Sequence, residues 1–262
     1  MFKDITLGQF YQADSVMHSL DPRTKLVGTF LYIIALFIAN DAAAMAAAVV
    51  FLCIAIALSR VPASFMFRGM KGIALILLLT VGFNIFLTPG VPIWTWGPLK
   101  VTAEGLRSAA FLACRLVLLI SGTSVMTLTT TPNSLTDAME SLLLPLTHIK
   151  VPVHEIALMM SIALRFIPIL MEETDKIMKA QMARGADFES GNFMKRAKSM
   201  VPILVPLFVS AFRRASDLAM AMEARCYSGG EGRTKLKPLK YGRGDVVAYI
   251  VQIAFVAAVI LL

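Results

Sequence analysis

The sequence predicts an all-α polytopic membrane protein with about five transmembrane helices and a cytoplasmic helical coupling domain. Three observations support this fold class. Hydrophobic residues make up 57% of the 262 residues, against roughly 45–50% in soluble domains. Charged residues make up only 16%, against about 25% in soluble domains. Long apolar runs approach the roughly 17–25 residues that a helix needs to cross a bilayer, so we expect the lipid bilayer as the main surroundings.

Five apolar segments are the candidate spans. They cover residues 26–39, 42–59, 72–88, 108–128 and 246–262. Polar or helix-breaking residues separate them, such as Asn40-Asp41 after the first and Pro89-Gly90 after the third. The predicted organisation is therefore spans 1 to 4 within residues 1–128, a coupling domain over 129–242, and a C-terminal span within 243–262.

The distribution of basic residues predicts the orientation in the membrane. Lys and Arg collect in cytoplasmic loops of membrane proteins. With a cytoplasmic N-terminus, the internal segments 1–25, 60–71 and 129–245 hold 3, 3 and 16 basic residues, whereas the external loops hold only Lys100 and Arg107. The net charge of +8 therefore indicates membrane topology, and we expect no nucleic-acid partner.

The predicted coupling domain contains one short and two long helices. Thr131-Pro132 begins a short helix to about Leu144, because Pro suits the first turn of a helix. Long helical patterns then run from about 152 to 184 and from 193 to 225. The sequence thus predicts two helices of more than thirty residues each beneath the membrane.

Three prolines fall within these long helices. Pro168 is predicted to kink the first, and Pro202 and Pro206 are predicted to interrupt the second. In a second interpretation, the apolar stretches 156–171 and 199–212 are an extra pair of spans. The charge distribution does not decide between them, because an inserted pair leaves both termini on the same sides.

Both long helices end in the same type of tripeptide. Ala183-Arg184-Gly185 ends the first and Ala224-Arg225-Cys226 ends the second. Small residues on either side of Arg allow close approach to another protein, and guanidinium offers a fork of donors to carboxylates or carbonyls. One such Arg would more simply complement the helix dipole, a contribution below about 1 kcal/mol. Two copies at matching positions favour a docking function.

No catalytic or metal-binding pattern accompanies these features. The glycine-rich run over 229–234 lacks the spacing and the Lys of a phosphate-binding loop. The histidines do not form a ligand cluster; they are His18, His148 and His154. We therefore predict no enzyme activity, no cofactor and no metal, so energy for any transport must come from a partner.

The sequence as a whole resembles a known family. The matching residues are the run 20–25 (Leu-Asp-Pro-Arg-Thr-Lys), Thr131-Pro132, the run 164–168 (Leu-Arg-Phe-Ile-Pro) and the two Ala-Arg-small tripeptides. In order and spacing these resemble the transmembrane T component of energy-coupling factor (ECF) transporters, the EcfT/CbiQ family. The likeness covers nearly the whole chain.

The resemblance implies partners and roles. In that family two ABC-type ATPase subunits bind beneath the T component, and a small membrane-embedded S component captures the vitamin or metal. Arg184 and Arg225 would be the docking arginines. The coupling helices, with Arg165 and the three prolines as support, would transmit the movement. Cys226 stands where the family usually has Gly. Because a residue with a Cβ adopts a left-handed backbone less readily than Gly, we do not expect that conformation to be as well tolerated there.

The predicted function is therefore the coupling subunit of an ATP-driven ECF importer of vitamins or related micronutrients. One alternative is the membrane subunit of a dedicated cobalt or nickel importer. A different class is a stand-alone secondary transporter or channel, which usually buries ionisable residues in its spans. The five predicted spans contain no Asp or Glu, and Arg115 is their only charge. We expect Arg115 to be structural.

Overall fold

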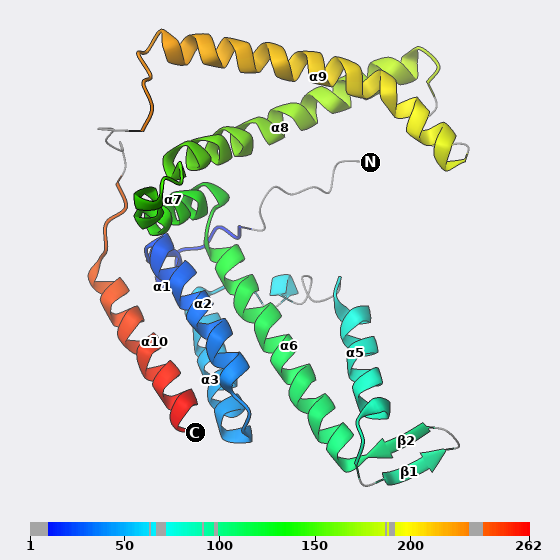
Figure 1. The fold of residues 1–262 in the computed structure, drawn as a ribbon, viewed down its shortest axis with the longest axis vertical. Helices are drawn as coiled ribbons and strands as arrows, with labels where there is room; N and C mark the ends of the chain where they lie inside the picture. The colour runs from blue at the N-terminus through cyan, green and yellow to red at the C-terminus, as the bar shows by residue number, and fades with distance from the viewer. Residues whose placement is uncertain are drawn as a thin grey trace. The chain divides into compact units, whose positions relative to one another are not determined.

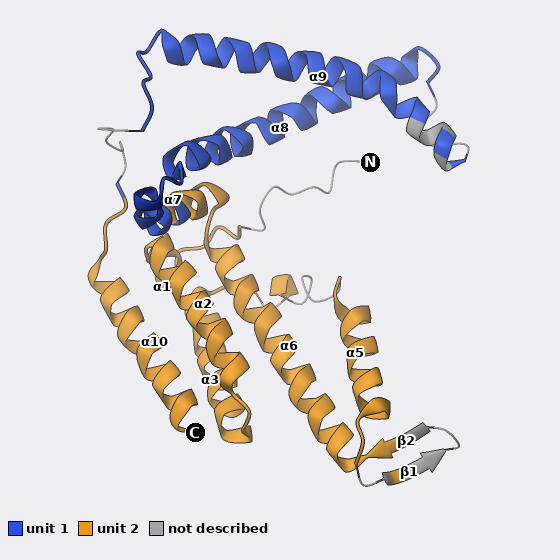
Figure 2. Ribbon diagram, viewed as in Figure 1, with its two compact units in different colours: residues 1–7, 139–238 blue, residues 8–138, 239–262 orange. Residues whose placement is uncertain are grey.

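The computed structural model describes residues 10–62, 64–66, 72–90, 92–96, 99–186, 188, 192–230 and 238–262. Residues 1–9 of the predicted cytoplasmic N-terminus and 231–234 of the glycine-rich run lie outside this description. Helices dominate the described residues (Figure 1), which confirms the predicted all-α class. The described residues form two compact units: unit 1 within residues 139–238, and unit 2 within residues 10–138 and 239–262 (Figure 2).

Unit 2 contains the predicted membrane helices and a hairpin. Its helices are α1 (Val16–Ser19), α2 (Pro22–Ile38), α3 (Ala42–Ser59), α5 (Ala74–Leu87), α6 (Ala103–Thr129), the first half of α7 (Pro132–Leu143) and α10 (Arg243–Leu261). Strands β1 (Pro92–Trp96) and β2 (Leu99–Thr102) pair antiparallel between α5 and α6. The sequence predicted only a loop at this position, because hairpin pairing is too short to show a clear pattern.

The core of unit 2 lies where α10 packs on α2 and α3, and where α6 packs on the same two helices. An aromatic stack closes it: the rings of Phe51 and Phe255 lie 4.2 Å apart, and Tyr32 stacks on both. The Tyr32 hydroxyl donates to the Leu118 carbonyl at 3.2 Å. Gly122 faces the Tyr32 ring so closely that a side chain would collide with it, so glycine permits this approach of α6 to α2.

Unit 1 contains the second half of α7, the 3₁₀ helix η1 (Leu144–Ile149), α8 (Val153–Ala183) and α9 (Phe193–Glu223). The two long helices therefore begin and end within two residues of the predicted limits. They pack against each other (Figure 1). The prediction that Pro202 and Pro206 interrupt the second helix is wrong, since α9 is continuous through both, and α8 is also continuous through Pro168.

The continuity of α9 has a physical reason. Pro206 has no N–H, so the carbonyl four residues earlier, that of Pro202, lacks its partner within the helix. Gln181 Nε2 of α8 donates to this carbonyl at 3.4 Å. A second polar contact joins the helices where Arg214 Nη2 lies 3.4 Å from Glu173 Oε2. The neighbouring helix thus supplies the bond that the proline removes.

Four helices in the described residues are long and apolar enough to cross a membrane: α3, α6, α8 and α10. The shorter apolar helix α5 matches the third predicted span. The presence of α8 in this set agrees, by length and composition, with the interpretation in which 156–171 spans the membrane. Its proposed partner stretch in α9 does not meet the same criterion among the described helices.

Candidate docking ends of the two long helices

The end of α8 is a helix stop that leaves its last residues on the surface. Gly185 has φ +88°, a left-handed conformation that favours glycine. Its N–H donates to the Met182 carbonyl at 2.9 Å, and the N–H of Ala186 donates to the Gln181 carbonyl at 3.0 Å. This pair of bonds is the Schellman motif, which satisfies carbonyls that a helix end leaves free.

The end of α9 repeats the same geometry with a different residue. Cys226 has φ +56°, and its N–H donates to the Glu223 carbonyl at 2.8 Å. The N–H of Tyr227 donates to the Met222 carbonyl at 3.1 Å. A left-handed conformation costs a residue with a Cβ about 1–2 kcal/mol. Cys226 therefore adopts the same left-handed backbone as Gly185, at that cost in stability.

All six residues of the two tripeptides are exposed; they are Ala183, Arg184, Gly185, Ala224, Arg225 and Cys226. Within the described residues, neither guanidinium makes a hydrogen bond or an ion pair. The last carbonyls of both helices already accept backbone N–H groups, so neither Arg is needed to cap its helix. Two charged donor forks are therefore free to bind an acceptor on another molecule.

The two ends are well separated within unit 1. Gln181, two residues before the end of α8, contacts Pro202, nine residues into α9. From there α9 extends for roughly 30 Å to its end at Glu223, at 1.5 Å per residue. The C-terminal ends of α8 and α9 lie at opposite ends of the helix pair (Figure 2). The pair thus presents two matched but separate ends to its surroundings.

The four predicted support residues are all exposed: Arg165, Pro168, Pro202 and Pro206. Of these, Pro202 takes part in the α8–α9 contact, because its carbonyl accepts the bond from Gln181. The sequence reasoning missed Gln181 and the pair Glu173–Arg214. One feature of the sequence could have indicated this pair: Glu173 and Arg214 are 41 residues apart, the same separation as Arg184 and Arg225.

The run 20–25 of the family resemblance acquires a structural role in unit 2. Asp21 caps α2, because its carboxylate accepts the backbone N–H of Arg23 at 2.9 Å and pairs with the Arg23 guanidinium at 3.0 Å. The N–H of Asp21 donates to Asp245 Oδ1 at 2.8 Å, and the guanidinium lies 3.9 Å from the centre of the Tyr241 ring. These contacts fasten the start of α2 to the start of α10.

The pKa of Asp21 reflects this arrangement. Burial alone would raise the pKa of the carboxyl, but the side-chain and backbone hydrogen bonds from Arg23 outweigh burial and lower it below 3.8. Asp21 is only 6% exposed, and a buried charge is costly unless it is paired. The carboxylate therefore stabilises the fold in its charged form.

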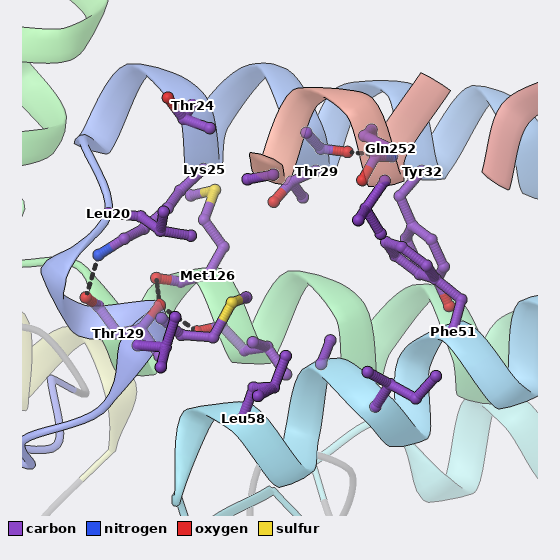
Figure 3. Close-up of a pocket in the computed structure, with 18 of the residues that line it drawn as sticks. Leu20, Thr24, Lys25, Thr29, Tyr32, Phe51, Leu58, Met126, Thr129 and Gln252 are labelled. Carbon is purple, nitrogen blue, oxygen red and sulfur yellow. Dashed lines mark hydrogen bonds between the residues drawn. The ribbon is translucent and has the colours of Figure 1, made fainter. Parts of the chain in front are cut away.

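Lys25 joins α2 to α6 and borders a cavity of unit 2 (Figure 3). Its ammonium donates to the carbonyl of Thr129 at 2.9 Å, at the end of α6, and to the carbonyl of His18 at 3.2 Å. The cavity holds about 250 Å³ and continues past Met126 to the aromatic stack at Phe51. Its lining is mainly apolar. The described residues contain no group of three or more potential metal ligands.

Arg115, which we expected to be structural, binds neutral oxygens within unit 2. Its Nη2 donates to the Ala39 carbonyl, which ends α2, at 2.6 Å, and lies 3.3 Å from Asn40 Oδ1. The guanidinium therefore binds internal oxygens at the link between α2 and α3. A coupling-ion site built on this charge would need an acidic partner, and both of these partners are neutral.

Comparison with known proteins shows which family this sequence matches. Residues 13–236 match the CbiQ family, described as "Cobalt transport protein". A protein of Clostridium kluyveri is 54% identical over the whole chain and 97% of its own length. Others are 51% identical in Ruminiclostridium cellulolyticum and 50% identical in Bacillus subtilis, each over at least 98% of that protein. All three are named "Energy-coupling factor transporter transmembrane protein EcfT".

Proposed function

The chain belongs to the CbiQ family, and on that premise we propose that it is the transmembrane coupling subunit of an ATP-driven ECF importer. In this proposal two ABC-type ATPase subunits bind beneath it, and a membrane-embedded S component supplies the substrate. Vitamins or related micronutrients are the substrate class. The full-length similarity to relatives named as ECF transporter transmembrane proteins supports the proposal.

The observation that carries this function is the matched geometry of the two helix ends. The left-handed backbone of Gly185 and Cys226 ends each helix directly after Arg184 and Arg225, so each guanidinium lies at an exposed helix end. An ATPase groove with carboxylates or carbonyl groups would accept such an end, and charge-assisted bonds contribute about 1.5–3 kcal/mol each. Two separate ends fit a pair of ATPases better than a single partner.

The proposed mechanism is mechanical. ATP binding closes the ATPase pair and moves both docked ends. Because Gln181 bonds to Pro202 and Arg214 pairs with Glu173, α8 and α9 respond as one body and pass the movement to the membrane helices and the S component. The sequence has no phosphate-binding loop of its own, so ATP hydrolysis belongs to the partners.

The orientation belongs to the same proposal. We place the N-terminus and both long helices on the cytoplasmic side, where the ATPases reach them. The second half of α8 is rich in charge and makes two polar contacts with α9, which suits an aqueous or interfacial position better than hydrocarbon. Whether α8 enters the bilayer is tested by labelling a cysteine in place of Met159, 59% exposed, with a membrane-impermeant maleimide.

A dedicated cobalt or nickel importer is the second candidate. The family description, "Cobalt transport protein", favours it. Uptake of tritiated riboflavin and of radioactive Co²⁺, each measured in cells that also contain an S component for that substrate, separates the two substrate classes. Transport by the chain alone would instead support a secondary transporter.

Co-purification tests the proposed function. The chain with Arg184→Glu and Arg225→Glu should lose the ATPases, with affinity at least about tenfold lower at each end. The matched control is Lys179→Glu with Arg213→Glu, which reverses the same number of charges at exposed sites on the same helices. If the double Arg variant retains both ATPases and normal uptake, the docking assignment is wrong.

A further inference from the structure

The segment that follows the second docking end packs directly on the start of α8. A Cβ built at Gly230 would lie 2.5 Å from Cδ2 and 2.7 Å from Cγ of the His154 ring, so only glycine fits without a shift. The preceding Gly229 has φ +103°, a conformation that also requires glycine. The two glycines, which form no phosphate-binding loop, thus serve a close contact between the chain after α9 and the first turn of α8.

The His154 imidazole also contacts a residue of α7. His154 Nδ1 lies 3.0 Å from Glu140 Oε1. Glu140 is only 8% exposed, and a buried carboxylate needs a hydrogen-bonded partner. The pair fixes the ring between the second half of α7 and Gly230. The end of α7, the start of α8 and the chain after α9 therefore meet at one side chain within unit 1.

The distance along the chain from the docking end to this contact is short. Three residues lie between Cys226 and Gly230, so their Cα atoms are at most about 14 Å apart even when the chain is extended. The left-handed turn at Cys226 is fixed by two backbone bonds. The link between Arg225 and the His154 contact is therefore too short for movement of Arg225 to be lost in a flexible loop.

We propose that Gly230, His154 and Glu140 form a latch that passes movement of the second docking end to the junction of α7 and α8. This inference rests on the proposed function, since it needs an ATPase at Arg225. Helix α7 begins three residues after the end of α6. Movement of the second docking end can therefore reach the membrane helices through the latch and α7, as well as through α9. His154 and Glu140 are positioning residues that touch neither nucleotide nor substrate.

Hydrogen exchange of the assembled complex tests the latch. The chain is purified with its ATPases and S component, with and without a non-hydrolysable ATP analogue. In the unaltered chain, we expect nucleotide-dependent exchange both at 222–228 and at 140–156. In Gly230→Ala, whose Cβ displaces the ring, the response at 222–228 should remain and the response at 140–156 should be lost.

Two further variants make the test specific. His154→Ala removes the ring without a collision and should give the same loss, and Gly230→Ala added to it should cause no further loss, because both act on one contact. Ser228→Ala, at an exposed position in the same segment, should behave as the unaltered chain. A merely structural role would alter exchange with and without nucleotide alike, which would overturn the latch.

The remaining outcomes are distinct. If Gly230→Ala and His154→Ala both keep the nucleotide response at 140–156, the latch is wrong while the docking proposal stands. If the unaltered chain shows no nucleotide response at 222–228, the docking of this end on an ATPase is wrong, and the latch is overturned with it.

Discussion

Gly185 and Cys226 have the same left-handed backbone, with φ +88° and +56°, at the ends of α8 and α9. Each is preceded by Arg and followed by a residue whose N–H returns to the carbonyl five positions earlier. The second end therefore keeps the shape of the first without its glycine. The two helix ends thus share Ala-Arg and the left-handed turn after it, and differ only in the residue that makes the turn.

The cost of Cys226 is measurable. Cys226→Gly should raise the free energy of unfolding by about 1 kcal/mol, because glycine adopts this backbone without the Cβ penalty. Cys226→Val should lower it, since a β-branched residue fits the left-handed region poorly. Thermal unfolding of the purified protein in detergent measures both. Cys226→Ala is the control: if it stabilises as much as Gly, the thiol rather than the backbone is the cause.

The bond from Gln181 to the Pro202 carbonyl predicts that the effects of substituting Gln181 and Pro206 are not additive. Gln181→Ala should destabilise unit 1 by about 0.5–1 kcal/mol, because the Pro202 carbonyl loses its donor. Pro206→Ala restores a backbone N–H to that carbonyl, so Gln181→Ala should cost almost nothing in that background. A double-mutant cycle on denaturation measures the difference. Equal costs of Gln181→Ala in both backgrounds would show that the bond does not compensate for the proline.

The carboxylate of Asp21 predicts a pH dependence. Its pKa in the folded chain lies below the ordinary 3.8, so its charged form contributes stability above that pH. The contribution is lost as the pH falls through the folded pKa. Asp21→Asn keeps a capping side chain but loses the charge, so its melting temperature should fall less than that of the unaltered chain between pH 5 and the acid limit of folding. Parallel acid dependences would contradict this role for Asp21.

The sequence predicted the long helices well and their contacts poorly. Their limits agree within two residues because an apolar periodic run followed by a Gly or small-residue stop is a local signal. The effect of Pro202 and Pro206 was misjudged because the compensating donor, Gln181, lies on another helix. The bond of Asp21 to Asp245 spans 224 residues, and no local pattern shows such a partner.

Part of the candidate site was visible and part was not. The paired tripeptides could be found from sequence alone, and their common backbone could not, because Cys226 gives no sign of a left-handed conformation. The contact of Gly230 with His154 was likewise hidden, since a glycine pair has many uses and its neighbour is decided by the packing of α8.

Site-specific crosslinking tests the central claim most directly. A photo-crosslinking amino acid is placed at Ala183 or at Ala224, beside the two proposed docking arginines, and as a control at Phe30, 66% exposed on α2. In membranes that contain the whole transporter, positions 183 and 224 should each crosslink to an ATPase subunit, the two together should capture two subunits per chain, and Phe30 should capture none. Efficient photoreaction at 183 and 224 without any ATPase product would contradict the account.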